Sequence, residues 1–477
     1  MTQWPTIIQG GMGAGVSSWK LARAVSSLGQ LGVISGIALD VILARRLQDG
    51  DPNGDARRAL AQFPIKSIAD RILTKYYVPG GKPADKPYAT VPMHTADSAR
   101  ALIELCIVGN FVEIYLAREG HDNPVGVNYL EKIQLPHLPS IYGAMLAGVA
   151  VVIMGAGIPT KIPGVLDAFV NHAPASYEIN VTGAQEGESA VVTFNPADFV
   201  EGDLPPLTRP KFFPIVSSNV LATTMLRRSN GVVDGFVVEA PIAGGHNAPP
   251  RGKLTLDEQG QPLYGEKDEV DLAKLRELGK PFWIAGGAAS PERLKAALAA
   301  GAQGVQIGTA FALCEESGLD ETYRRQLLQT SVDGEASVYT DRLASPTGFP
   351  FKVAQLASSL SEADVYAARQ RVCDLGYLRE AYRKEDGAIG YRCAAEPVDQ
   401  YVRKGGKVED ADGRKCLCNA LLANIGHGQV RGAQHVAELP LLTAGDDLKT
   451  IARFIPPGRT SYTARDVIEQ VMGDLAT

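Results

Sequence analysis

The sequence lacks a long apolar run, lacks a block of like charge, and has few cysteines for its length. The longest apolar stretch, residues 144–157, is too short and too rich in glycine to span a bilayer. With 47 basic and 53 acidic residues the net charge is −6, and no basic run favours nucleic acid or an anionic membrane as a partner. Six cysteines among 477 residues argue against a disulfide scaffold.

The N-terminal residues, MTQWPTIIQGG, show neither the basic segment nor the long apolar segment of a secretory signal. We therefore expect a soluble, cytoplasmic protein with no nucleic-acid or membrane partner. Apolar residues make up 45% of the chain, which is enough for a large core. The length allows a barrel of typical size plus at least one further unit.

Residues 281–311 follow a pattern of strand, glycine turn, helix, strand and glycine turn. The first apolar run ends at Gly286-Gly287, and the second ends at Gly308-Thr309. Backbone N–H groups in such turns, with a helix N-terminus behind them, can bind an anion. In (β/α)8 barrels the loops after the last two strands commonly hold a phosphate. The pattern indicates the end of such a barrel, but an ordinary βαβ unit whose glycines only allow the turn fits it equally well.

Eight short apolar runs alternate with helical segments over the first two thirds of the chain. They lie near residues 7, 33, 127, 151, 215, 237, 284 and 306. This alternation predicts a parallel sheet, and eight strands favour a closed barrel over an open sheet. We therefore predict an α/β protein whose residues 1–320 form a (β/α)8 TIM barrel.

Three segments depart from the simple barrel pattern. Residues 40–123 are polar and partly helical, and we expect them to be an insertion after the second strand. Residues 175–200 alternate like a β-hairpin and are predicted to be an excursion from the barrel. Residues 321–477 are predicted to be an additional, mostly helical C-terminal region, with helices over 321–330, 362–376 and 464–472 and a long loop at 330–360. We expect this region to pack on the barrel and to cover its mouth.

The sixth strand leads into the sequence EAPIAGGHNAPPRGK. His246 is the one histidine of seven that follows a glycine pair at a strand end, Gly244-Gly245, where the backbone can approach a flat ligand closely. Barrel chemistry occurs on these loops, and an imidazole can exchange a proton near neutral pH. We therefore favour a catalytic His246 over a loop histidine that only bonds the backbone. Arg251 and Lys253 follow and could attract an anion, although such side chains are more often simply solvated.

Five motifs occur in order at the predicted strand ends: IIQGGMGAGVS, VGVNYL, EAPIAGGHN, IAGGAAS and GVQIGTAF. Together, over about residues 5–312, they resemble the nitronate monooxygenase (2-nitropropane dioxygenase) family of FMN-dependent TIM barrels. The same superfamily includes FMN-dependent enoyl-acyl-carrier-protein reductases, and this chain is closer in size to the stand-alone members of that group.

The resemblance implies FMN as the cofactor and places its ring on the loops of the first and third strands. Gly10, Gly11 and Met12 would lie against the ring, and Asn128 would hydrogen-bond its edge. His246 would face the substrate and act as acid or base. A strand-end asparagine that only stabilises a turn is the alternative for Asn128.

The resemblance also implies contacts to the ribityl chain and the phosphate. Glu239 would bind ribityl hydroxyls, and its alternative is a carboxylate paired with a nearby Arg or Lys. The remaining contacts would come from backbone groups at Gly244 and Gly245, near the cofactor, and at Gly286, Gly287, Gly308 and Thr309, around the phosphate.

For the reaction, the resemblance implies oxidation of alkyl nitronates by O2 to a carbonyl compound and nitrite. An enoyl-acyl-carrier-protein reductase or an NAD(P)H:quinone reductase, each using NAD(P)H, would need the same residues, so the site alone does not choose among them. A non-catalytic flavin-binding subunit of a synthase complex is a further alternative. The oligomeric state stays open, with a homodimer as one option.

The chain also departs from the family pattern. Some members have a lysine at the end of the fifth strand, where Ser217 and Ser218 stand here. The loop after His246 is longer and richer in proline than the usual one. Barrels like inosine monophosphate dehydrogenase need a nucleophilic cysteine after a barrel strand, and neither Cys106 nor Cys314 is placed for that role.

Four cysteines gather near the C-terminus, at positions 373, 393, 416 and 418. Four thiolates could hold a zinc ion or an iron–sulfur cluster. The usual doubled C-x2-C spacing is absent, however, and only one C-x-C pair occurs. Free, mostly buried thiols are the more common outcome, so we assign no metal site. Nearby, Tyr339, Arg342 and Lys352 flank the SPTGFPF loop and could close over the site.

Overall fold

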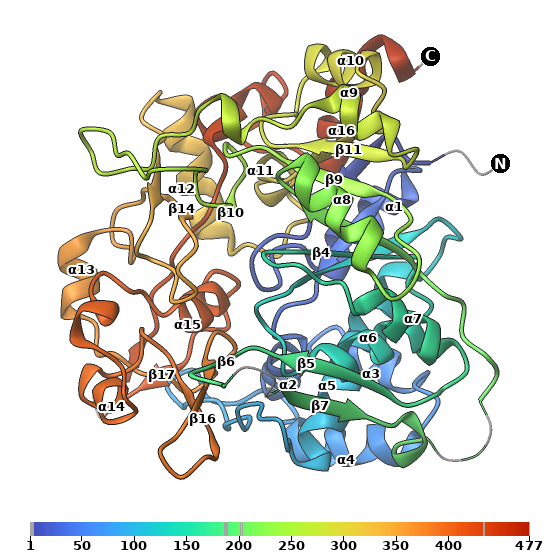
Figure 1. The fold of residues 1–477 in the computed structure, drawn as a ribbon, viewed down its shortest axis with the longest axis vertical. Coiled ribbons are helices and arrows are strands. Elements are labelled where there is room, and N and C mark those ends of the chain that lie inside the picture. Colours follow the sequence, from blue (N-terminus) through green and yellow to red (C-terminus); the bar gives the residue numbers. More distant parts are fainter. Residues whose placement is uncertain (1–3, 186–188, 201, 203, 433–434, 477) are drawn as a thin grey trace.

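The computed structural model describes residues 4–185, 189–200, 202, 204–432 and 435–476 (Figure 1). Residues 1–3, 186–188, 201 and 203 of the predicted barrel and hairpin lie outside the described residues. The same holds for residues 433–434 and 477 of the predicted C-terminal region. No helix in the described ranges is long and apolar enough to cross a bilayer.

The eight predicted barrel strands are all present and form one parallel sheet in the order β1-β12-β11-β9-β8-β4-β3-β2. The sheet closes between its first and last strands, because the Gln9 N–H donates to the Leu31 carbonyl at 2.9 Å and the Leu31 N–H donates to the Ile7 carbonyl at 3.1 Å. The prediction of a (β/α)8 barrel is therefore confirmed. The strands are β1 (Ile7–Gln9), β2 (Gly32–Ser35), β3 (Val125–Leu130), β4 (Val151–Gly155), β8 (Lys211–Val216), β9 (Phe236–Glu239), β11 (Phe282–Ala285) and β12 (Gly304–Ile307).

Apolar side chains fill the interior of the barrel. Trp4, Phe213 and Trp283 pack with ring centroids 5.0–5.7 Å apart. The indole N–H of Trp283 is satisfied by the Pro5 carbonyl at 2.9 Å. Ile8 and Val237 belong to the same buried cluster. Because the interior is packed, a ligand can lie only at the carboxyl ends of the strands.

The outer helices follow the strands in the expected alternation. Ser290 caps the helix after β11 by accepting the Arg293 N–H at 3.3 Å, as its position in the sequence predicts. Ser218 caps the helix after β8 in the same way. The helices are α1 (Trp19–Ser27), α6 (His137–Leu146), α7 (Ile162–Val170), α8 (Asn219–Arg228), α9 (Leu272–Glu277), α10 (Pro291–Ala299) and α11 (Thr309–Ala312).

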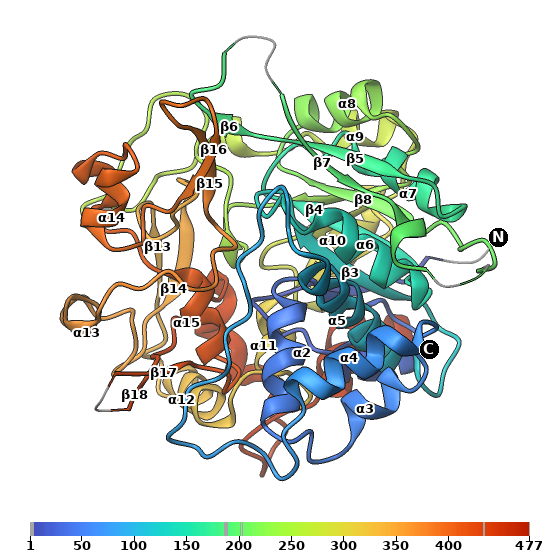
Figure 2. The same ribbon diagram turned by 90° about the horizontal axis from the view of Figure 1, so that it is seen from below.

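The segment between β2 and β3 holds α2 (Leu39–Gln48), α3 (Asp55–Leu60), α4 (Lys66–Tyr76) and α5 (Arg100–Arg118). It is more helical and more buried than its polar composition indicates. Most of α5 is buried, and this helix packs against α1, α2 and α6. Residues 77–99 form no helix or strand and run along the outside of the molecule (Figure 2).

Residues 175–200 contain the predicted antiparallel pair, formed by β5 (Ala175–Ile179) and β7 (Ala190–Phe194). The short strand β6 (Val181–Thr182) lies between them in sequence but pairs with β15 (Glu380–Arg383) of the C-terminal region. This long-range pairing has no signature in the local sequence.

The C-terminal region contains helices and short strands. The predicted helices at 321–330 and 464–472 correspond to α12 (Glu321–Val332) and α16 (Ala464–Met472). The other elements are α13 (Ala363–Ala368), α14 (Val398–Arg403), α15 (Leu417–Ala423), the 3-10 segment η4 (Asp446–Phe454), β13 (Val338–Asp341), β14 (Phe351–Ala354), β16 (Ile389–Arg392), β17 (Val430–Arg431) and β18 (Val436–Ala437).

Two local predictions for this region are wrong. The helix expected over 362–376 stops at Ala368, after which Arg369 turns away to pair with Glu438 at 2.6 Å. The loop expected at 330–360 contains the hairpin β13–β14. Since residues from before and after position 320 share one apolar core, the division of the chain at that point stays a proposal.

Candidate active site

A cavity of about 1770 Å³, measured to its open mouth, lies at the carboxyl ends of the barrel strands. Barrel loops form one side of it, and the C-terminal region forms the opposite wall. Every residue that the family resemblance assigns to the site lines this cavity: Gly10, Gly11, Met12, Asn128, Glu239, Gly244, Gly245, His246, Gly286, Gly287, Gly308 and Thr309. The fold therefore brings the whole predicted set together, while the roles of these residues remain proposals.

The glycine at position 11 is required by close packing. A Cβ placed on Gly11 would lie 2.4 Å from the Asn128 Cβ, far inside van der Waals contact. At the other end of the cavity, Gly286 and Gly287 adopt φ values of +98° and +59°, which side chains of L-residues rarely allow. These turns keep backbone at the cavity surface, where side chains would otherwise fill the space.

Two buried amide oxygens on the barrel side have no hydrogen-bond partner within the described part of the chain. They are Oδ1 of Asn128 on β3 and Oε1 of Gln306 on β12, and both residues line the cavity. An unpaired buried oxygen is costly, so these atoms indicate a ligand that carries N–H or O–H donors. Gln306 was not among the residues predicted from the sequence, although it stands two residues before Gly308 in the GVQIGTAF motif.

Glu239 ends β9 with its carboxyl group at the cavity. Among the described residues it forms no hydrogen bond or ion pair in the structure, so the alternative of a carboxylate paired with Arg or Lys is not observed. Burial raises the pKa of this carboxyl to about 8. Near neutral pH, Glu239 can therefore donate a hydrogen bond as an acid or accept one after ionisation.

We predict that Glu239 makes the flavin-free protein less stable as the pH rises. A raised folded pKa means that its contribution is fully present below the ordinary value of 4.5 and is lost as the pH rises through about 8. Between pH 5 and pH 8, the unfolding free energy of the parent should fall by roughly 2–4 kcal/mol relative to Glu239→Gln. Urea unfolding at several pH values measures this difference. Glu258→Gln, at an exposed loop position, is the control, and parallel pH profiles for all three proteins would contradict the prediction.

His246 lies on the short strand β10 (Gly245–His246), which pairs with β14. Its Nε2 is 2.7 Å from the Ser345 hydroxyl, and its ring packs edge-on against Phe351 with centroids 4.9 Å apart. Burial lowers the pKa of His246 to about 4, so the imidazole is neutral at neutral pH. No hydrogen bond from the ring to the backbone occurs in the described chain. In the tautomer whose Nε2–H donates to the Ser345 hydroxyl, Nδ1 is free to accept a proton.

The predicted phosphate turns are joined to the C-terminal region. The Thr309 hydroxyl accepts the Gly445 N–H at 2.9 Å and hydrogen-bonds Asp447, whose pKa is raised by burial. Protonation of Asp447 would remove a negative charge that opposes an anion at this position. Arg453 places a positive charge beside the turn, where it donates to the Ala289 carbonyl at 2.9 Å. Neither Asp447 nor Arg453 was predicted from the sequence.

The candidate lid residues take other positions. Tyr339, Arg342 and Lys352 do not line the cavity, and Arg251 and Lys253 also lie outside it. The Lys352 ammonium is buried and binds Asp446 at 2.8 Å and the Thr340 hydroxyl at 2.9 Å. The wall is instead formed by residues that were not predicted, among them Phe351, Tyr377, Leu378, Cys418, Leu421, Asn424, Leu442, Thr443, Ala444 and Gly445.

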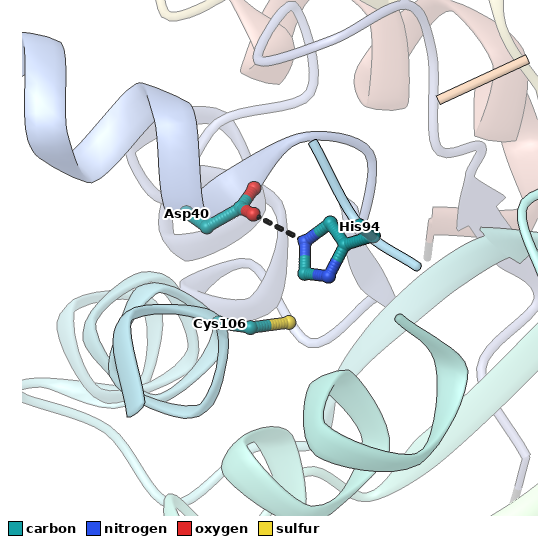
Figure 3. A group of neighbouring side chains, drawn as sticks. All are labelled: Asp40, His94 and Cys106. Atoms are coloured by element: carbon teal, nitrogen blue, oxygen red, sulfur yellow. Dashed lines mark hydrogen bonds and ion pairs between the residues drawn. The ribbon is translucent and has the colours of Figure 1, made fainter. Parts of the chain in front are cut away.

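One wall residue, Tyr377, is joined to a buried polar group behind the cavity. Its hydroxyl donates to Asp40 Oδ1, and Asp40 Oδ2 lies 2.8 Å from His94 Nε2. Cys106 lies in the same group, and the donor atoms of Asp40, His94 and Cys106 are all within 4.8 Å of one another (Figure 3). This arrangement fixes the Tyr377 ring through residues of the 40–123 segment.

Comparisons with known proteins agree with the family resemblance. Residues 208–340 match the family model for nitronate monooxygenase, and this stretch contains Glu239, His246 and the two turns that are predicted to hold a phosphate. The nitronate monooxygenase of Paraburkholderia phytofirmans is 40% identical over 116 residues, which are 24% of this chain and 29% of that protein. The probable nitronate monooxygenase of Bacillus subtilis is 32% identical over 117 residues, which are 24% of this chain and 32% of that protein. The chain thus matches about a third of the length of these relatives.

Solved structures of similar fold cover almost the whole chain. FabK from Thermotoga maritima covers 99% of this chain and 93% of its own, with 18% identity and a TM-score of 0.49. The nitroalkane oxidase from Streptomyces ansochromogenes covers 99% and 96%, with 17% identity and a TM-score of 0.47.

Proposed function

We propose that this chain is an FMN-dependent oxidoreductase that oxidises alkyl nitronates with O2 to a carbonyl compound and nitrite. The observation that carries the proposal is that one cavity brings two parts of the barrel together. Glu239, His246 and two glycine turns lie in the stretch that matches nitronate monooxygenase. In the cavity they meet Gly11 and Asn128 from the start of the barrel.

The cavity fits a flavin. Its unpaired oxygens on Asn128 and Gln306 can accept the N–H donor that a flavin ring carries, and the carboxyl of Glu239 can bind ribityl hydroxyls. Gly287 and Gly308 would offer backbone to the phosphate. The chemistry that FMN supplies when bound is electron transfer from the substrate to O2.

The side chains at the cavity bind, orient and move a proton. A nitronate is already an anion and needs no base, whereas a neutral nitroalkane must first lose its α-proton. His246 is the one imidazole that lines the cavity in the described part of the chain, and it is neutral at neutral pH. It is therefore the residue that would remove this proton. Phe351 and Tyr377 limit the access of water from the C-terminal side.

Anaerobic stopped-flow spectroscopy tests the proposal directly. The purified protein is mixed separately with propyl-2-nitronate and with NAD(P)H, and the loss of flavin absorbance is followed. Rapid loss with the nitronate and little response to NAD(P)H would support a monooxygenase. Rapid loss with NAD(P)H alone would instead support an enoyl or quinone reductase. A colourless protein that binds no FMN would contradict both.

A further inference from the structure

Four of the six cysteines, which are spread over residues 373–418, meet at one place in the structure. Cys393 and Cys416 are buried together with Ala395, and Cys373 and Cys418 pack against them. They come from three separate segments: the turn after α13, the end of β16, and the start of α15. All four are free thiols, and Cys373 hydrogen-bonds Cys393.

Backbone donors face three of the four sulfurs. The backbone N–H of Ala395 donates to the Cys393 sulfur, and that of Asn419 donates to the Cys416 sulfur. The backbone N–H groups of Tyr377 and Leu378 donate to the Cys418 sulfur. Donors of this kind orient and stabilise sulfur when it carries a negative charge, as it does when it binds a metal.

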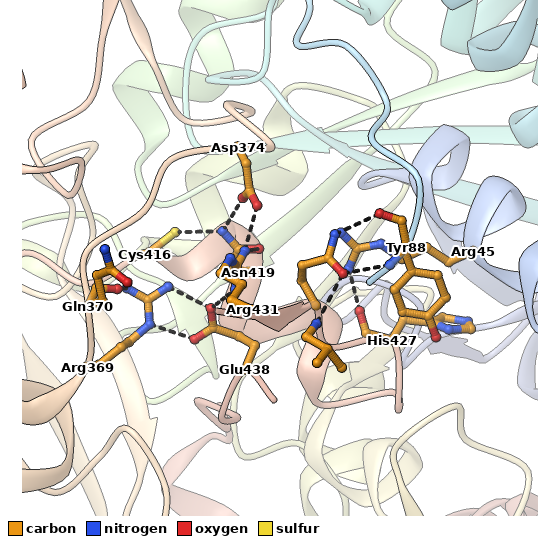
Figure 4. Close-up of polar contacts among 12 residues, drawn as sticks. Arg45, Tyr88, Arg369, Gln370, Asp374, Cys416, Asn419, His427, Arg431 and Glu438 are labelled. Atoms are coloured by element: carbon orange, nitrogen blue, oxygen red, sulfur yellow. Dashed lines mark hydrogen bonds and ion pairs between the residues drawn. The ribbon is translucent and has the colours of Figure 1, made fainter. Parts of the chain in front are cut away.

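Polar and charged side chains surround the cluster. The Asn419 amide donates to the Cys416 sulfur at 3.5 Å and to Asp374 at 2.7 Å. Asp374 is bound in turn by Arg431 (Figure 4). Arg369 raises the positive potential at Cys416, and Arg379 does the same at Cys373. The acidic groups that face Cys373 are Asp374 and Glu396; the first is paired with Arg431 and the second with Lys404.

We propose that Cys373, Cys393, Cys416 and Cys418 together bind a thiophilic metal centre, a zinc ion or an iron–sulfur cluster, in the wall of the cavity. A bound cation would displace the four thiol protons and compensate the negative charge of the sulfurs. Zinc and iron–sulfur clusters are the two centres that four cysteine ligands commonly hold.

The sulfurs lie too far apart for one zinc ion to bind all four as they stand in this structure. A single zinc ion holds its sulfurs at about 2.3 Å, which places them about 3.8 Å from one another. Among the described residues, one group of three or more possible metal ligands has all its donor atoms within 4.8 Å of one another. That group consists of Asp40, His94 and Cys106. No three of the four sulfurs are therefore that close. A cluster of several irons spreads its cysteine ligands more widely, because different irons bind them.

The position of the centre has a structural consequence. Tyr377, Leu378 and Cys418 line the cavity, so a metal at Cys418 would hold this wall in place opposite the barrel loops. The proposal is independent of the reaction, because metal binding can be measured whether or not the chain oxidises a nitronate.

The test is the metal and acid-labile sulfide content of the full-length protein purified without oxygen. We expect either iron with a similar amount of sulfide or about one zinc per chain. The metal content of Cys393→Ser and of Cys416→Ser should be lower than that of the wild-type protein by about tenfold or more. Cys314→Ser, at a buried single thiol that donates to the Phe311 carbonyl, should retain it. A wild-type protein without metal, even after incubation with Zn²⁺ or with Fe²⁺ and sulfide, would overturn the proposal.

X-ray absorption at the metal edge of the wild-type protein decides the case even if a serine variant fails to fold. Sulfur as the only protein ligand is expected for the four-cysteine site. A mixture of nitrogen, oxygen and a single sulfur would overturn the proposal, because the group of Asp40, His94 and Cys106 would then hold the metal.

Discussion

Replacing His246 with asparagine should lower the turnover of a neutral nitroalkane by about 10²–10⁴-fold and leave the bound FMN unchanged. When the Nε2–H of the neutral imidazole donates to Ser345, its other nitrogen can take the α-proton of the substrate. Asparagine has a similar size but cannot accept a proton near neutral pH. Steady-state kinetics with a nitroalkane and with the matching nitronate would measure the effect, and the loss should be much smaller for the nitronate.

The controls separate catalysis from folding. His435→Asn changes a histidine that binds the Asp85 carbonyl, away from the cavity, at a φ of 52° that asparagine tolerates. Its turnover should equal that of the parent. Equal turnover of nitroalkane by His246→Asn and by the parent would place the base elsewhere. No turnover by the parent itself would indicate a non-catalytic flavin-binding subunit.

The pH profile gives a second measurement for His246. Because burial holds the pKa of His246 at about 4, the imidazole stays neutral to lower pH than an ordinary histidine. The kcat/KM for a nitroalkane should therefore fall only as the pH drops through about 4, not through 6.5. The His246→Asn variant should lack this acid limb.

Replacing Asp40 with alanine should reduce the free energy of unfolding by about 3–5 kcal/mol. Asp40 is buried and accepts hydrogen bonds from both Tyr377 and His94. Alanine would leave these two polar groups buried without a partner. The same change would release Tyr377 from its position in the cavity wall, so FMN content should also fall.

Urea unfolding of Asp40→Ala measures this loss of unfolding free energy. Asp97→Ala, at an exposed position near His94, is the control. Burial raises the pKa of Asp40, but the hydrogen bond and charge of His94 and the hydrogen bond of Tyr377 outweigh it, so the pKa lies below its ordinary value. The contribution of Asp40 to stability is therefore present above the ordinary pKa and is lost as the pH falls through the lowered one. A loss of unfolding free energy below about 1 kcal/mol at pH 7 would show that the hydrogen bonds of Asp40 contribute little to stability.

The barrel and one side of its cavity could be predicted from local sequence patterns. Each strand is a short apolar run that ends in glycine or a small polar residue, and parallel strands bring those ends to one rim. His246 was predicted from its place after a strand-end glycine pair, and Gly11, Asn128 and Glu239 from the family resemblance; all four line one cavity.

The opposite wall depends on contacts between residues far apart in the chain, which leave no periodic signal. Tyr377 and Asp40 are 337 residues apart, and Thr309 binds Gly445 across 136 residues. The four cysteines follow no common spacing, yet folding brings them into one cluster. Side-chain pairing over such separations is set by packing of the whole chain, so the tertiary structure was needed to show what faces the predicted site.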